Sequence, residues 1–368
     1  MKKSLNLLKL VATGLTVIPI IRGSVRNLSP KLLQKERLIS YYQDKNLAKI
    51  KDKFQAQRFV DKKFFSEQSD FLKDLNENQK KAVTCPDKRI CVIAGPGCGK
   101  TKTMTSRAVH LLKNDLVKPD QILLVTFSKN SAEEMESRIR DYLRKEEELL
   151  PNNIGTIHSF CYRFLQENSH SFGAEDVDVC IREHQEDLVQ EILKEMNSAL
   201  CFNSREIKDI VKEIAYCKSS GINDFYLMND FHRKVAFKYQ EYSEKNHLLD
   251  FEDLLLNTLK ILQENQKVRE KYQERFSHIL VDEFQDVNEI QWKIIQLLTA
   301  EGKSLFVVGD PNQCIYGFQG ANPELIANLK KDVNWTDIHL NINYRSNGNI
   351  IKATNDFSIT ICKIICLF

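Results

Sequence analysis

The sequence lacks any strong excess of charge. Its 368 residues include 53 Lys and Arg and 50 Asp and Glu, which gives a formal net charge of +3. Overall basicity therefore gives no sign of nucleic-acid binding, and any such surface would have to be local. The apolar and charged fractions are those of a globular protein, and the length is enough for about two domains with separate cores.

The chain also lacks C-x-x-C pairs, although it has ten cysteines. This scatter indicates a reducing compartment, so we expect a cytoplasmic protein. Cys362 and Cys366 have no histidine close by, and apolar tail residues explain them better than metal ligands.

The amino terminus has neither a small-x-small cleavage site nor an apolar run long enough for a clear bilayer span. Its apolar stretch, Leu10 to Ile21, is interrupted by Gly14 and Pro19. A buried or surface-associated helix is the favoured interpretation. Membrane association through residues 4–21, as an anchor or an uncleaved signal, is the alternative.

The stretch Ala94-Gly-Pro-Gly-Cys-Gly-Lys-Thr101 follows an apolar run and has the composition of a phosphate-binding loop. Glycines let backbone N–H groups surround a triphosphate, and a helix starting near Lys100 directs its positive end at the anion. Lys100 would neutralise phosphate oxygens, and the Thr101 hydroxyl suits Mg²⁺. Ala94 stands where the usual pattern has its first glycine, so the loop alone does not establish the site. The predicted nucleotide contacts here are Gly95, Pro96, Gly97, Cys98, Gly99, Lys100, Thr101 and Lys102.

A short helix capped at Asn76 is expected just before this strand, and Gln79 is its candidate for chemistry. A carboxamide offers a donor and an acceptor in one plane, which matches the edge of adenine. Taken alone, a solvent-facing helical glutamine would be the better interpretation.

Continuous apolar runs joined through helices, such as Gln121 to Phe127, indicate a parallel sheet buried on both faces. A further strand is expected to end at Thr156. Open α/β sheets place ligands at the carboxyl ends of their strands, where these residues could hold a phosphodiester backbone or stack on bases. For either phenylalanine alone, core packing is the favoured interpretation. The candidates are Thr126, Phe127, Asn130, Thr156, His158 and Phe160.

Adjacent carboxylates follow another apolar strand in His278-Ile-Leu-Val-Asp-Glu-Phe-Gln-Asp286. They would emerge at the sheet edge that carries the phosphate loop. Asp282 would accept Mg²⁺, and Glu283 would act as general base on the water that attacks the γ-phosphorus.

Two later segments complete the predicted constellation. Gln313 follows a strand and is placed to sense the γ-phosphate, while Phe318 on the adjoining loop could stack on a base. Arg345 could stabilise charge on the transferred phosphoryl group, and Tyr344 offers a flat surface for adenine.

In this order, these segments resemble the UvrD/Rep-type superfamily 1 DNA helicases, helicase IV-like members included. The resemblance covers about Leu75 to Ser346 and places Gln79, Asp282, Glu283, Gln313, Tyr344 and Arg345 on family motifs. It implies ATP and Mg²⁺ as cofactors and 3′-to-5′ movement on single-stranded or partly duplex DNA. Lys102, Phe318 and Gln319 depart from the residues that many members have.

The resemblance also implies a domain organisation. An α/β, RecA-like P-loop parallel sheet (domain 1A) is expected over residues 75–160 and 247–350, with a helical insertion (domain 1B) over 161–246. Residues 1–74 would form an N-terminal apolar segment and helical extension, in which a charged helix face is favoured over a basic aromatic patch at 58–65. Residues 351–368 do not look like the family and are expected to be an aberrant or truncated tail.

Motifs of the family's second RecA-like domain are not found in the sequence, so that domain is expected to be absent and the chain to be deficient in unwinding. A separately encoded second half is then a candidate partner. The alternatives are a non-motor ATP- and DNA-binding remnant or regulator, and a P-loop small-molecule kinase. The kinase is disfavoured because it needs no water-activating glutamate beside the Mg²⁺ aspartate.

Overall fold

The computed structural model describes residues 70–354 except 115, 145, 173–177, 180–181, 197–201, 220–224, 247, 315–320 and 323. The chain divides into two compact units, Met1–Asp74 and Leu75–Phe368. The predictions for residues 1–69, including the apolar stretch, and for the tail beyond 354 lie outside the described residues. In the first unit, only a single turn, α5 (Asp70–Lys73), can be described with its neighbours to Asp74.

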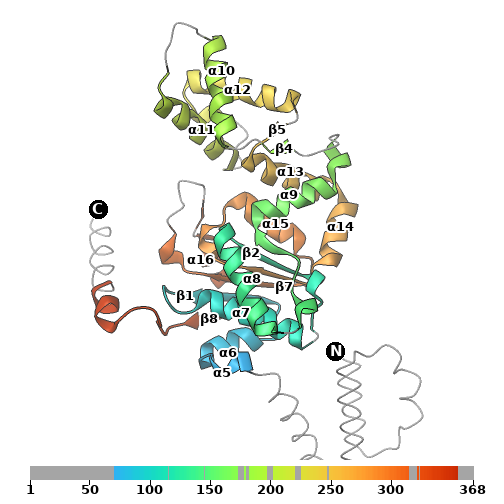
Figure 1. The fold of residues 1–368 in the computed structure, drawn as a ribbon, viewed down its shortest axis with the longest axis vertical. Coiled ribbons are helices and arrows are strands. Elements are labelled where there is room, and N and C mark those ends of the chain that lie inside the picture. The colour runs from blue at the N-terminus through green and yellow to red at the C-terminus, as the bar shows by residue number, and fades with distance from the viewer. Residues whose placement is uncertain are drawn as a thin grey trace, which may run out of the picture. The chain divides into compact units, whose positions relative to one another are not determined.

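A six-stranded parallel sheet forms the centre of the second unit, and it confirms the predicted α/β parallel-sheet fold (Figure 1). The apolar runs of the sequence become strands because both faces of the sheet are covered by helices. Every residue of two central strands is buried. The spatial order is β3 (Ile154–Thr156), β2 (Ile122–Thr126), β6 (His278–Val281), β7 (Ser304–Gly309), β1 (Arg89–Ala94) and β8 (Thr336–Leu340).

Helices cover the two faces of this sheet. On one face, Leu305 and Val307 belong to a core that also contains side chains of α9, α13 and α15. On the other face, the guanidinium of Arg107 from α7 lies over the ring of Phe306. The helices are α6 (Glu77–Thr84), α7 (Lys100–Lys113), α8 (Lys129–Leu143), α9 (Ile157–Glu167), α13 (Phe251–Glu264), α14 (Gln266–Arg275), α15 (Glu289–Leu298) and α16 (Glu324–Lys331).

Between α9 and α13 the chain forms a separate helical group with its own core, which runs from Leu188 to Tyr239. The group contains α10 (Arg182–Met196), α11 (Ser204–Ser219) and α12 (Asp230–Lys245), with the two-stranded sheet β4 (Asp178–Val179) and β5 (Leu248–Leu249) at its base (Figure 1). All three helices lie within residues 161–246, where a helical insertion was expected.

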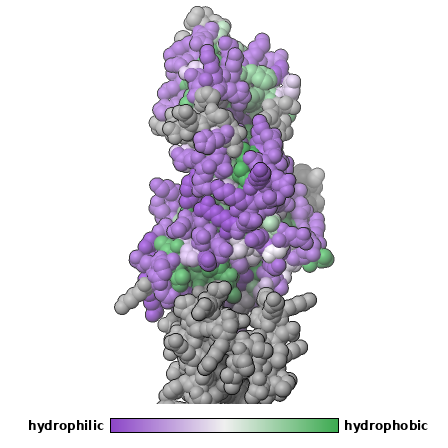
Figure 2. All heavy atoms as spheres, turned by 90° about the vertical axis from the view of Figure 1, so that its right-hand side faces the viewer, coloured by the Kyte–Doolittle hydropathy of each residue, from purple (hydrophilic) through white to green (hydrophobic). Residues whose placement is uncertain are grey.

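Short 3-10 turns connect these elements: η2 (Pro119–Gln121), η3 (Glu147–Leu149), η4 (Ser169–Phe172), η5 (Phe225–Leu227), η6 (Phe284–Asp286) and η7 (Pro311–Gln313). Over the described residues, one face of the molecule is largely hydrophilic, with small separate hydrophobic areas (Figure 2). Within the described part of the chain, no helix has the length and apolar character needed to cross a membrane.

Candidate functional site

The loop between β1 and α7 has the backbone geometry of a phosphate cradle. Gly97 and Gly99 have φ angles of +72° and +84°, a region that L side chains rarely adopt, and Gly99 is the N-cap of α7. The missing first glycine also has a physical explanation. Ala94 is the buried last residue of β1 and pairs with Leu340 of β8, so it lies in the strand and not in the turn.

The predicted catalytic residues lie beside this loop. Lys100 Nζ is 3.4 Å from Glu283 Oε2, and Thr101 Oγ1 is 3.5 Å from Asp282 Oδ2. The sheet brings them together because the carboxyl ends of β1 and β6 are at one edge, with β7 between them. Burial, and next the charge of Glu283, raise the pKa of Asp282 to about 7. A cation at this position would stabilise the charged carboxylate.

Glu283 is held in an unusual backbone conformation. Its φ angle is +47°, in the left-handed region, and its N–H donates to Asp282 Oδ1 at 3.0 Å. Non-glycine residues with such angles are uncommon and concentrate at functional sites. This turn directs the two neighbouring carboxylates differently, with Asp282 toward Thr101 and Glu283 toward Lys100.

Gln79 is buried against the phosphate loop and does not face solvent. Asn76 caps α6 as predicted, in a capping box whose other half is the Gln79 side chain. The Gln79 Nε2 donates to the carbonyl of Cys98 at 3.1 Å. A Cβ on Gly99 would lie 2.7 Å from that nitrogen, so the glycine makes room for the amide. The sequence did not reveal this contact, which joins the candidate base-reading residue to the loop.

The segment after β8 packs onto the phosphate loop from the other side. The Tyr344 N–H donates to the Gly97 carbonyl at 2.9 Å, and Asn343 Nδ2 donates to the Pro96 carbonyl at 2.7 Å. The Tyr344 hydroxyl accepts a hydrogen bond from Asn76 Nδ2 at 2.7 Å. This arrangement places Tyr344 and the exposed Arg345 at the loop. It also adds Asn343 to the site, a residue that the sequence motifs did not predict.

Gln313 lies in η7, just beyond the end of β7, and its amide donates to Asp310. Lys102 lies in the first turn of α7, next to Thr101. Phe318 falls outside the described residues. The structure therefore brings the predicted nucleotide residues to one edge of the sheet.

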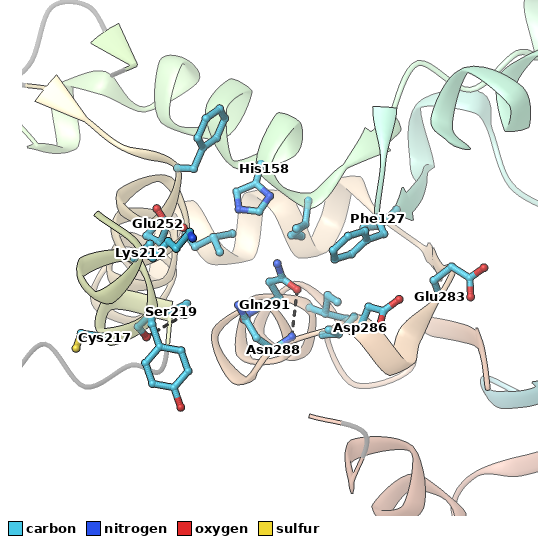
Figure 3. Close-up of a pocket in the computed structure, with 18 of the residues that line it drawn as sticks. Phe127, His158, Lys212, Cys217, Ser219, Glu252, Glu283, Asp286, Asn288 and Gln291 are labelled. Carbon is cyan, nitrogen blue, oxygen red and sulfur yellow. Dashed lines mark hydrogen bonds between the residues drawn. The ribbon is translucent and has the colours of Figure 1, made fainter. Parts of the chain in front are cut away.

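A cavity of about 830 Å³ opens beside the carboxylates (Figure 3). Phe127 and His158 line it, with Glu252 of α13, Lys212 of α11 and Gln291 of α15. The His158 ring meets Phe251 edge to face at 6.0 Å, and burial lowers the pKa of His158 to about 4, which keeps it neutral near pH 7.

One predicted DNA contact needs correction, and a second is buried. Phe160 is 4% exposed and packs against Phe164, Tyr272 and Phe276, so its ring is part of the core and cannot stack on a base. The hydroxyl of Thr126 is buried without a hydrogen-bond partner in the structure, but Thr126 lines the cavity beside the carboxylates and stays a candidate for strand contact.

Other predicted DNA contacts lie near the sheet edge. Asn130 is exposed at the start of α8, and Phe127 is 36% exposed. Thr156 is the N-cap of α9, where its hydroxyl accepts from the Ser159 N–H at 3.1 Å. These residues stay candidates for strand contact, although Thr156 also has a structural role.

Comparison with known proteins agrees with this geometry. Residues 75–334 match the model of the UvrD/REP helicase N-terminal domain. The chain is 34% identical over 299 residues to the DNA helicase II of Haemophilus influenzae, which covers 78% of this chain and 41% of the relative. It is 33% identical over 300 residues to a probable DNA helicase II homolog of Mycoplasma capricolum subsp. capricolum, covering 77% and 40%.

The ATP-dependent DNA helicase PcrA of Staphylococcus epidermidis is 32% identical over 292 residues, which cover 77% of this chain and 40% of the relative. The chain thus spans about two fifths of the length of the curated relatives it matches. The family match covers the phosphate loop, both carboxylates, the helical group and every strand of the main sheet except β8, which begins at Thr336. The chain belongs to the UvrD/REP helicase family, of which it carries the N-terminal domain.

Proposed function

We propose that this chain is the ATP-binding core of a DNA helicase motor, which binds ATP with Mg²⁺ and hydrolyses it to move on single-stranded DNA. In this proposal residues 75–160 and 247–350 form domain 1A, and 161–246 form domain 1B. The observation that carries it is the approach of Lys100 and Thr101, at the phosphate loop, to Glu283 and Asp282. The names of the relatives, DNA helicase II and ATP-dependent DNA helicase, support the same activity.

The residues present suit Mg²⁺. A hydroxyl and a carboxylate oxygen are hard ligands, and the buried Asp282 would gain from a cation. In the described ranges, no group of three or more His, Cys, Asp or Glu side chains could hold a metal ion. Mg²⁺ needs no such group, because one or two carboxylates plus substrate phosphates commonly bind it. Thr101 and Asp282 would hold the ion, which would neutralise charge on the phosphate oxygens.

The other side chains have distinct roles in the proposal. Lys100 exchanges its contact with Glu283 for the phosphates, and the released Glu283 carboxylate accepts a proton from the attacking water. Gln79 and Tyr344 contact the adenine, and Gln313 and Arg345 lie toward the terminal phosphate. DNA would lie along the sheet edge, at Phe127, Asn130, Thr156 and His158.

The test uses a fluorescent ATP analogue and measures both binding and hydrolysis by the 368-residue chain. Lys100→Met should weaken binding by roughly 100-fold, because a buried phosphate partner is lost. Glu283→Gln should keep the affinity within about threefold and lower the hydrolysis rate by about 10²- to 10⁴-fold. Equal binding by wild type and Lys100→Met, or undiminished hydrolysis by Glu283→Gln, would overturn the proposal.

A further inference from the structure

Gln285 is a buried side chain that joins several parts of the candidate site. Its Nε2 donates to Glu283 Oε2 at 2.9 Å and to Asp286 Oδ2 at 3.2 Å, and its Oε1 accepts from the Asp310 N–H at 2.9 Å. Only 2% of Gln285 is exposed. One amide plane therefore uses both its donors and its acceptor, which fixes its orientation.

The network continues from Asp310 to the γ-phosphate candidate. One oxygen of Asp310 accepts from the Asn312 N–H at 3.0 Å, and the other accepts from the side-chain amide of Gln313. An unbroken path of hydrogen bonds thus runs from Glu283 through Gln285 and Asp310 to Gln313. The path crosses from the end of β6 to the end of β7, its neighbour in the sheet.

Gly309 makes this crossing possible. A Cβ on Gly309 would lie 2.8 Å from Gln285 Oε1, 2.9 Å from Ile326 Cδ1 and 3.2 Å from the Gln285 backbone nitrogen. Gly309 does not have a positive φ angle, so its backbone conformation is open to other residues. The glycine is required here for close approach and not for conformation.

We propose that Gln285 is a positioning residue that holds the Glu283 carboxylate in register with the Asp310–Gln313 segment. The inference rests on the proposed function, because it assigns Glu283 the role of general base. A neutral amide suits this place, since it donates to two carboxylates at once without adding charge. Movement of Gln313 toward or away from a bound nucleotide would pass through Asp310 to Glu283.

The experiment compares Gln285→Ala, Gly309→Ala and the double variant with the wild-type chain. The matched control is Gln185→Ala, which removes another buried glutamine, in α10 of the helical group and outside the candidate site. Each protein is assayed for kcat and KM of ATP hydrolysis, for the melting temperature, and for hydrogen exchange of the Asp310 amide.

We expect both single variants at 285 and 309 to lower kcat by about 10- to 100-fold while KM changes less than about threefold, because a misplaced base slows chemistry and not binding. The double variant should lose less than the two single losses combined, since the closest contact of a Cβ at position 309 is with the amide. Gln185→Ala should lower the melting temperature but change kcat less than about threefold. Additive losses, a kcat within threefold of wild type for Gln285→Ala, or losses in KM alone would overturn the inference.

The exchange measurement separates this inference from the proposed function. If the wild-type chain hydrolyses no ATP, the proposed function fails at that step, but the network is still tested. Gln285→Ala should then speed exchange of the Asp310 amide at least about tenfold, because the N–H loses its acceptor. Unchanged exchange in that variant would overturn the inference whatever the hydrolysis rate of the wild type.

Discussion

Two buried lysines of this molecule show the difference between a site and a structural ion cluster. Lys100, at the phosphate loop, lies 3.4 Å from Glu283, a distance too long for a strong hydrogen bond. Lys218, at the end of α11, lies 2.7 Å from Asp250 and 2.8 Å from Asp253. Both are less than a tenth exposed.

The contrast is in how completely each ammonium group is satisfied. Burial alone would lower the pKa of Lys218, but the charges of Asp250 and Asp253 outweigh it and raise that pKa above its ordinary value. The Tyr239 hydroxyl also donates to Asp250 at 3.2 Å. This cluster joins the helical group to α13, and it is closed in the sense that the ammonium group already has two carboxylate partners at short distance. The loose contact of Lys100 leaves the ammonium able to change partners, which is what a ligand site requires.

The largest effect is expected from a substitution that breaks the closed cluster. Lys218→Met leaves two buried carboxylates without their cation and should lower the free energy of unfolding by about 3 to 5 kcal/mol. Lys212→Met, on the same helix but exposed, is the control and should change it by less than about 0.5 kcal/mol. Urea unfolding measures both. A loss below about 1 kcal/mol for Lys218→Met would show that the cluster of Lys218, Asp250 and Asp253 contributes little to stability.

The next prediction tests the excess negative charge beside that cluster. Burial, followed by the charge of Asp250, raises the pKa of Glu252 to about 7. A raised carboxyl pKa favours the folded state at low pH, and this contribution is lost as pH rises from about 4.5 through 7. Glu252→Gln avoids that loss and should be more stable than wild type by about 1 to 3 kcal/mol at pH 8.

The advantage of Glu252→Gln should shrink toward zero near pH 4, where the unfolded carboxyl is protonated too. Thermal unfolding at pH 4, 6 and 8 measures the trend. If the stability difference between the variant and the wild type does not depend on pH, the pKa of Glu252 is the same in the folded and the unfolded chain.

A third, smaller effect separates backbone strain from crowding at the phosphate loop. Gly99→Ala places a side chain at φ +84° and within 2.7 Å of Gln79, whereas Gly302→Ala meets the same φ with its nearest contact at 3.5 Å. We expect a loss of about 1 to 2 kcal/mol from conformation in both. Weakened ATP binding is expected for Gly99→Ala alone, and titration with the analogue would reveal it. Equal affinities of the two variants for the analogue would show that crowding against Gln79 does not weaken ATP binding.

The smallest effect concerns the exposed contact between Tyr344 and Asn76. Tyr344→Phe removes one hydrogen bond and should cost less than about 1 kcal/mol of unfolding free energy. Asn76→Ala removes the same bond and also the cap of α6, so it should cost up to about 2 kcal/mol. Urea unfolding of both variants measures which of them loses more unfolding free energy. The reverse order would mean that the segment after β8 holds α6 more firmly than its own cap does.

Much of the sheet and its edge could be predicted, because strands, turns and caps leave local signals. The apolar run before Ala94 and the glycines after it are contiguous, and the cap at Asn76 is visible within four residues. The motif made Phe160 a candidate for stacking on a base although core packing was favoured for the residue alone, and the structure places its ring in the core.

Contacts between residues that are far apart in the sequence leave no such local signal. Lys218 is 32 residues from Asp250, and Gln285 is 25 residues from Asp310, with no periodic pattern linking either pair. Asn343 contacts Pro96 across 247 residues. These pairings depend on strand order and helix packing, which the separate segments do not specify.

The position of β1 in the sheet has a consequence for how the protein is made. β1 pairs only with β7 and β8 among the described strands, and both are synthesised more than 200 residues later. A ribosome must therefore translate to Gly309 before β1 can pair with β7, and to Leu340 before it can pair with β8, while the helical group, with its short-range contacts, can form earlier. During synthesis the phosphate loop is thus complete in sequence long before it is supported by its sheet.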